Sequence, residues 1–331
     1  MERFALAAAV VLGFALTAAL CSLFVPLRRV LERREQQQQP VQPEQPRPAP
    51  LRAPLWGGLC AAAGTVAAVG VGWLAACVGQ PELLGSEGRL MTRLLTALAG
   101  SLAFGAVGFA EDLARMRSPA ALGLRRDVRL LLEALAAAFV LLLLQAAGCL
   151  PRGLDVPGAG YVLLGSAVPF LWAVLMVVLA ECARIAERDE GTVCGAAFVA
   201  MLALMMAEAG LGVPGLAVLP AALAGALVAL GLWAFPPARL GVGCCGSLLA
   251  AGAIGCIPLS LDMTSLTVPL ALPFWAAGGL LAAQLLCAKR TGKPLRCWVK
   301  KHKMSPETVF LCSFALSAVG YVLALALLRW C

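Results

Sequence analysis

The stretch FALAAAVVLGFALTAALCSLFVP, residues 4–26, contains no charged side chain and is followed by Arg28, Arg29, Arg33 and Arg34. At a rise of 1.5 Å per residue, a helix of about 20 apolar residues spans a hydrocarbon core of roughly 30 Å. A signal peptide would carry its positive charge before the apolar core and small residues at a cleavage site. The stretch is therefore predicted to be a first membrane helix with its N-terminus outside.

Similar apolar runs recur along the chain. Of its 331 residues, 61% are hydrophobic and 13% are charged, whereas soluble domains carry about a quarter charged residues. The alternating segments of about ten residues that a membrane β-barrel needs are not found in the sequence. We expect an all-α, polytopic integral membrane protein, a single membrane domain over residues 1–331. Its ten expected membrane segments are 4–26, 55–79, 92–110, 128–148, 161–181, 193–210, 213–234, 241–260, 265–287 and 308–329.

The positive charges predict how these helices are oriented. If the N-terminus is outside, the inner loops, with Arg129 counted in the second, hold 21 of the 26 Lys and Arg residues. Cytoplasmic loops of membrane proteins carry such an excess. The net charge of +8 thus predicts topology rather than nucleic-acid binding, because no recognised nucleic-acid-binding fold accompanies it. We expect a multi-pass cell-membrane protein with both termini outside and inner loops 27–54, 111–127, 182–192, 235–240 and 288–307.

The first inner loop has a biased composition. Residues 35–50 read EQQQQPVQPEQPRPAP and are rich in Gln and Pro. Such a segment cannot form a packed core, so it is predicted to be a flexible cytoplasmic linker.

Four polar clusters interrupt the apolar pattern at the expected inner helix ends. Carboxylates at a membrane boundary can hold Mg²⁺ together with substrate phosphates, and a basic loop attracts phosphate groups or anionic lipid. The Gly-rich turn at Gly243 and Gly246 would let backbone N–H groups approach a phosphate at a helix start. The clusters favour phosphoryl chemistry on a lipid phosphate, with solvated helix-end charges that only mark topology as the alternative. They are GFAEDLARMRSPAALGLRRDVR, AECARIAERDEGTVCG, LWAFPPARLGVGCCGSL and KRTGKPLRCWVKKHKMSPET.

The order and spacing of these clusters resemble the prenyl-phosphate phosphosugar transferases of the MraY/WecA superfamily (glycosyl transferase family 4), and the MraY type most closely. PLWGGL at 54–59 looks like the family's P-T-M-G-G-L, and GFAEDLAR at 108–115 looks like G-F-x-D-D-x-x-K. PARLGVGCCGSL at 237–248 looks like P-A-x-x-F-M-G-D-x-G-S-L, and AKRTGK at 288–293 looks like F-K-R-T-G-K. The resemblance covers almost the whole chain. It implies ten helices and transfer of phospho-MurNAc-pentapeptide from a UDP-sugar to undecaprenyl phosphate with Mg²⁺.

The departures from this resemblance fall on the chemistry. The aspartate pair of the family is matched by Glu111 and Asp112, and its lysine by Arg115. The catalytic metal-ligand aspartate falls on Cys244, and an asparagine nine residues before the family's G-D pair falls on Ala234. Thiolate is a poor ligand for Mg²⁺, which prefers oxygen. The family's N-x-x-N-x-x-D-G-x-D-G falls on Glu181, Arg184, Glu187, Arg188, Glu190 and Gly191, and its histidine triplet is reduced to His302.

These matches and departures predict an MraY-like protein whose catalytic motifs are degenerate. The degenerate site would comprise Glu111, Asp112, Arg115, Glu187, Glu190, Cys244 and His302. No cofactor is expected; in the alternative, Mg²⁺ would lie on Glu111 and Asp112. A paralogue of this kind would bind prenyl phosphate, or regulate or scaffold envelope (peptidoglycan) synthesis, as a homodimer or with envelope-synthesis proteins. The alternatives are an active, divergent transferase and a transporter or unrelated membrane protein.

Overall fold

The computed structural model describes residues 2–38, 56–79, 89–117, 123–151, 153–156, 160–163, 165, 167–187, 191–212, 215–235, 239–291 and 306–328. Almost all of them are helical. The elements are α1 (Glu2–Gln38), α2 (Gly57–Gly79), α4 (Arg89–Arg117), α5 (Arg126–Ala146), β1 (Gly153–Val156), β2 (Gly160–Leu163), α6 (Ala167–Ala186), α7 (Thr192–Gly210), α8 (Val218–Ala234), α9 (Gly243–Ser260), η1 (Thr264–Leu266), α10 (Thr267–Leu270), α11 (Leu272–Thr291) and α13 (Pro306–Leu328).

The helices confirm an all-α polytopic membrane protein. Seven described helices are long and apolar enough to cross a membrane, and an eighth span is formed if Thr264–Leu270 and Leu272–Ala283, bent by 62°, count as one. The shorter apolar helix α8 has 17 residues. Each of the ten predicted segments coincides with a described helix or with this bent pair. Because only seven or eight of them meet the criteria for a membrane span, the number of ten spans stays a prediction.

Two boundaries differ from those predicted. Residues 161–163 were expected to begin a membrane helix but form β2, which pairs antiparallel with β1 so that Gly153 lies opposite Leu163. The sequence itself carries turn signals here, because one proline and three glycines fall within residues 153–160, GLDVPGAG. Such clustered Gly and Pro residues favour a hairpin over a helix. Helix α1 continues to Gln38, four residues into the predicted linker; residues 39–50 of that linker lie outside the described residues.

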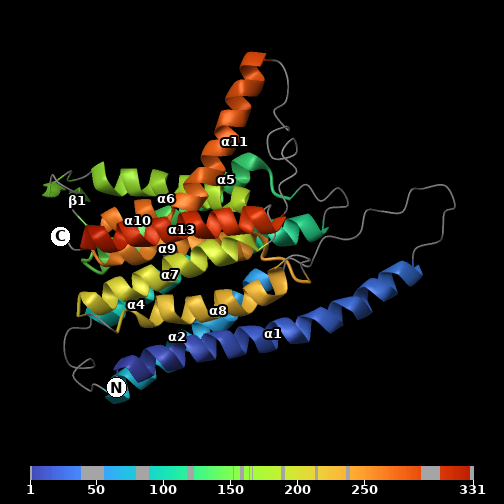
Figure 1. The fold of residues 1–331 in the computed structure, drawn as a ribbon, viewed down its shortest axis with the longest axis horizontal. Coiled ribbons are helices and arrows are strands. Elements are labelled where there is room, and N and C mark those ends of the chain that lie inside the picture. Colours follow the sequence, from blue (N-terminus) through green and yellow to red (C-terminus); the bar gives the residue numbers. More distant parts are fainter. Residues whose placement is uncertain are drawn as a thin grey trace.

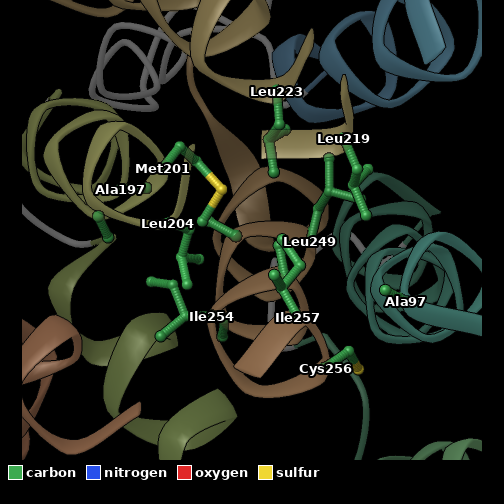
Figure 2. Packing of buried hydrophobic residues seen from close by; sticks show 14 of the residues in the cluster. Ala97, Ala197, Met201, Leu204, Leu219, Leu223, Leu249, Ile254, Cys256 and Ile257 are labelled. Carbon is green, nitrogen blue, oxygen red and sulfur yellow. The ribbon is translucent and has the colours of Figure 1, made fainter. Parts of the chain in front are cut away.

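Helix α9 is the centre of the bundle. All of its residues from Gly243 to Ser260 are buried, and it contacts α2, α4, α6 and α7. Figure 2 shows Leu249, Ile254 and Ile257 of α9 among residues of α4, α7 and α8. Because α9 is rich in Gly, Ala and Cys, neighbouring backbones approach it closely, as is typical of helix packing in membranes.

The two ends of the bundle differ in what they carry. In Figure 1 the start of α1, the hairpin and the end of α13 lie at one end of the bundle. The end of α4 and the start of α9 meet each other, and α2 begins beside them, because Gly58 packs on Gly246. Successive long helices alternate in direction, so this meeting point is at the end away from the chain termini (Figure 1). The predicted site residues that the structure describes lie there.

Candidate functional site: a carboxylate–arginine cluster

Helix α4 carries three of the predicted site residues at its end. Glu111 and Asp112 are 2% and 1% exposed, and Arg115 follows on the same helix face. The spacing of four residues lets Arg115 Nη2 donate to Glu111 Oε1 at 2.9 Å. Charges this well buried are costly unless they are paired, so the partners of each carboxylate decide what the site can do.

Asp112 is held by the first amides of α9. Its Oδ1 accepts the backbone N–H of Cys244 at 3.0 Å, and its Oδ2 accepts that of Cys245 at 2.8 Å. The first N–H groups of a helix have no partner within the helix, and the helix dipole favours a negative charge there. Asp112 therefore caps α9 from a neighbouring helix. The sequence suggested that N–H groups at this helix start could bind a phosphate. In the structure, those of Cys244 and Cys245 donate to Asp112 instead.

Two glycines make this close approach possible. A Cβ at Gly108 would lie 2.2 Å from the carbonyl oxygen of Cys244, and a Cβ at Gly58 would lie 2.1 Å from the backbone nitrogen of Gly246. A larger residue at either position would push α4 or α2 away from α9. The motifs GFAEDLAR and PLWGGL thus bring backbone to backbone at the start of α9, and the first of them sets the distance at which Asp112 reaches the amides.

Arg115 lies among three carboxylates. Besides Glu111, its Nη1 is 4.0 Å from Asp112 Oδ1 and 3.9 Å from Glu187 Oε2, which follows the end of α6. The side chain of Cys244 also lies near the guanidinium. Five predicted site residues are therefore brought together by the fold, and the positive charge at their centre is an arginine.

A second set of ion pairs extends the site across α5 and α6. Arg129 Nε donates to Glu181 Oε1 at 2.8 Å, and its Nη1 is 3.5 Å from both oxygens of Glu111. Arg184 donates to the other oxygen of Glu181. Glu133 is fully buried, 4.0 Å from Arg129 Nε, and within the described residues neither of its oxygens has a hydrogen-bond partner.

We call these eight side chains the carboxylate–arginine cluster: Glu111, Asp112, Arg115, Arg129, Glu133, Glu181, Arg184 and Glu187. Sequence reasoning counted Arg129 only as a marker of topology and did not single out Glu133. A signal was present, because Glu133 interrupts an apolar run four residues after Arg129, the spacing of neighbours on one helix face. The predicted site residues Glu190 and His302, and Arg188 beside them, lie outside the described residues.

The cluster does not fit Mg²⁺ as it is arranged. Both oxygens of Asp112 accept backbone N–H groups, and Glu111 is paired with two guanidinium groups. Mg²⁺ demands near-octahedral oxygen ligands at about 2.0–2.1 Å, and Cys244 offers sulfur where the family resemblance places an aspartate. Within the part of the chain that the structure describes, no three His, Cys, Asp or Glu side chains are gathered to hold a metal ion.

Comparisons with known proteins place the chain in a family. It is similar to the phospho-N-acetylmuramoyl-pentapeptide-transferase of Mycobacterium tuberculosis, with 28% identity over 265 residues that cover 72% of each chain. It is also similar to the protein of that name from Desulforudis audaxviator, with 34% identity over 170 residues, 48% of this chain and 50% of the relative. The family model for glycosyl transferase family 4 matches residues 94–262, more than half of the 331 residues. The chain therefore belongs to glycosyl transferase family 4, the superfamily of MraY-like proteins.

Proposed function

We propose that this protein is a catalytically inactive MraY-like membrane protein that binds prenyl phosphate lipid and regulates or scaffolds peptidoglycan synthesis. One observation carries the proposal: the guanidinium of Arg115 lies between the three carboxylates of Glu111, Asp112 and Glu187, beside the thiol of Cys244. A metal clamp stabilises the charge that develops on a transferring phosphoryl group. Losing the metal ion is expected to lower the rate of phosphosugar transfer by about 10³-fold or more.

The membrane fold supports the lipid half of the proposal. The cluster lies at one end of a bundle with seven to eight apolar spans among the described helices. A prenyl chain in the bilayer could therefore place its phosphate, at the membrane boundary, near the cluster. Three arginines already lie among the five carboxylates of the cluster, and Glu111 and Glu181 are each paired with two of them. The site therefore needs no bound ion to be stable, which suits a protein that binds or scaffolds rather than transfers.

We also propose that the chain's termini face the outside and the cluster faces the cytoplasm. The excess of Lys and Arg in the predicted inner loops supports this orientation, because cytoplasmic loops carry that excess. A tag at either terminus should be labelled from outside, and a tag inserted between residues 35 and 50 only after permeabilisation. Cytoplasmic labelling of the C-terminus would contradict both this orientation and the count of ten spans.

The alternative is an active, divergent transferase that uses Mg²⁺. Two observations favour it: Glu111, Asp112 and Glu187 still converge, and the relatives of this chain bear the name of a transferase. The two functions differ in one product. The purified full chain is incubated with undecaprenyl phosphate, a panel of UDP-sugars and Mg²⁺, beside the M. tuberculosis relative, and UMP is measured.

We expect UMP from the relative and none above background from this chain. The variant Cys244→Asp should also release none, because Ala234, Arg184 and the single histidine His302 are unchanged. UMP release by the unmodified chain that is lost in Glu111→Gln or Asp112→Asn would overturn the proposal in favour of the active transferase.

A further inference from the structure

Two cysteines face each other where α1 packs against α2. Cys21 of α1 and Cys60 of α2 are both buried, and their thiols are hydrogen-bonded to each other. Neither forms a disulfide in the structure. Because the two cysteines belong to different helices, a bond between their sulfur atoms would fasten α1 to α2.

The register of the two helices fixes this pair. One turn before the cysteine of α1, Thr17 lies against Gly64, where an added Cβ would be 2.2 Å from Thr17 Oγ1. One turn after that cysteine, the ring of Phe24 stacks on the ring of Trp56 with 5.7 Å between their centroids. Residues three and four apart lie on one face of a helix. The two cysteines therefore form the layer between these contacts, and the helices run antiparallel.

The two helices pack closely at this layer. An added Cβ at Gly64 would also be 3.1 Å from the backbone nitrogen of Thr17, so the glycine lets the backbones approach each other. A disulfide needs Cα atoms roughly 4.4–6.8 Å apart, and closely packed helices can meet that requirement. A disulfide is also neutral, so it suits an apolar interior in which a thiolate would be costly to bury.

The pair is shielded from water by the bundle and from lipid by α1 alone. Helix α1 runs along one edge of the bundle (Figure 1), and it carries the exposed apolar side chains of Phe4, Val11 and Leu23. Buried thiols are poorly reactive toward reagents in water. An oxidant dissolved in the bilayer is therefore the kind that would meet this pair when α1 separates briefly from α2.

We infer that Cys21 and Cys60 are a redox-reactive pair that a lipid-soluble organic hydroperoxide oxidises to a disulfide, which fastens α1 to α2. One thiol sulfur attacks the O–O bond, takes up the terminal oxygen as a sulfenic acid, and its proton leaves with the alcohol. The second sulfur then forms the S–S bond and displaces water. One hydroperoxide and two thiols thus give one disulfide, one alcohol and one water.

The link is expected to be reversible. With the orientation proposed above, both cysteines lie in the inner half of their helices, because each is near the end that leads into the first inner loop. Disulfides that form on the cytoplasmic side are usually transient and redox-sensing. The pair would therefore respond to oxidised lipid rather than hold a permanent bond.

The link would act beside the carboxylate–arginine cluster. Gly58, two residues before Cys60, packs on Gly246 so closely that an added Cβ would be 2.1 Å from the backbone nitrogen of Gly246. Cys245, whose N–H donates to Asp112, also lies near Cys60. Fastening the start of α2 to α1 would therefore hold in place the backbone that packs on the start of α9.

The test uses the full chain, reduced and reconstituted in liposomes, with cumene hydroperoxide as the oxidant. Remaining thiols are trapped with N-ethylmaleimide, and disulfides are mapped by mass spectrometry. A peptide that joins Cys21 to Cys60 should be the main disulfide product and should disappear on reduction. Cys60→Ser should lose this product completely. Cys256→Ser is the matched control and should keep it, because Cys256 is equally buried but lies on α9 against Gly100.

Three results would overturn the inference, and each leaves the proposed function intact because none concerns the cluster's metal or lipid. The first is absence of the Cys21–Cys60 link in oxidised chain that is still folded. The second is a main product that joins Cys21 to Cys194, which also lies near it, or Cys60 to Cys245. The third is an equal yield of the link in chain unfolded before oxidation, because the packing of α1 on α2 would then not select the pair.

Discussion

The two sides of the carboxylate–arginine cluster satisfy their polar groups in different ways. On the α9 side, the partners of Asp112 are two backbone amides, which glycine packing holds in place. The other side, which we call the α6 side, is held by ion pairs between side chains of α5 and α6. Its residues are Arg129, Glu133, Glu181 and Arg184. Within the described residues Glu133 and the Nε of Arg184 lack hydrogen-bond partners. Both oxygens of Asp112 are hydrogen-bonded on the α9 side, whereas polar atoms without a hydrogen-bond partner are found on the α6 side. Substitutions on the α9 side should therefore lower the free energy of unfolding more than substitutions on the α6 side.

The largest effect is expected at Asp112. Asp112→Ala would leave two buried N–H groups of α9 without an acceptor and remove a charge from a helix start. The free energy of unfolding should fall by about 3 kcal/mol or more. Reversible chemical unfolding in mixed micelles measures it. Asp127→Ala, at an exposed position in the first turn of α5, is the control and should have a much smaller effect. Equal losses for the two variants would contradict the capping role of Asp112.

The next largest effect tests the packing beneath that cap. In Gly108→Ala the new Cβ would meet the carbonyl oxygen of Cys244 at 2.2 Å, so α4 and α9 must separate. Overpacking of this kind costs about 2 kcal/mol. At Gly105, on the same helix, the nearest atoms belong to the Leu249 side chain at 3.3 Å and 3.4 Å, so Gly105→Ala should cost less. A larger loss of unfolding free energy in Gly105→Ala than in Gly108→Ala would show that the contact between Gly108 and Cys244 does not set the distance between α4 and α9.

A smaller effect is expected at Arg129 on the α6 side. Arg129→Gln removes the bridge between Glu111 of α4 and Glu181 of α6. Because Glu181 is partly exposed, solvent will screen part of the loss, which should be about 1–2 kcal/mol. Arg126→Gln, one turn earlier and exposed, provides the comparison in the same unfolding experiment. If Arg129→Gln were as stable as Arg126→Gln, the bridge would contribute nothing to the fold.

The smallest effect is expected at Glu133. Its carboxylate is fully buried and has no hydrogen-bond partner among the described residues, so Glu133→Gln removes a charge that costs free energy to bury. The free energy of unfolding should change by less than about 1 kcal/mol, or rise. The same unfolding curves give the value. A loss greater than that of Arg129→Gln would mean that Glu133 has a strong partner and that the α6 side is more complete than it appears from the contacts of the described residues.

The helices could be predicted from the sequence because about 20 apolar residues have few ways to be satisfied in a bilayer except as a helix. The hairpin at 153–163 was missed, since its strands are four residues each and carry little periodic signal. Within the site, the family resemblance led us to expect Glu111, Asp112, Arg115, Glu187 and Cys244 in one place; the structure has them near one another, and their functional role stays a prediction. The acceptor role of Asp112 could not be read from residue types, because its partners are backbone amides that any residue supplies.

The partners of Arg129 were missed for a different reason. A charge beside a membrane segment is ordinarily read as a topology marker, and Glu181 is 52 positions away in sequence. Only the packing of α5 against α4 and α6 shows that the two meet. Long-range pairing of this kind depends on which helices are neighbours, which apolar periodicity does not specify.

The most direct test of a site whose carboxylates are paired with arginines rather than with a metal ion is the melting temperature of the unmodified chain as a function of Mg²⁺. A ligand raises the melting temperature in proportion to its binding to the native state. If arginines already satisfy the carboxylates, the melting temperature should show no saturable change with Mg²⁺ and should respond alike in the unmodified chain and in Glu111→Gln. A saturable rise in the unmodified chain that disappears in Glu111→Gln would contradict this account and show that the site still binds a divalent cation.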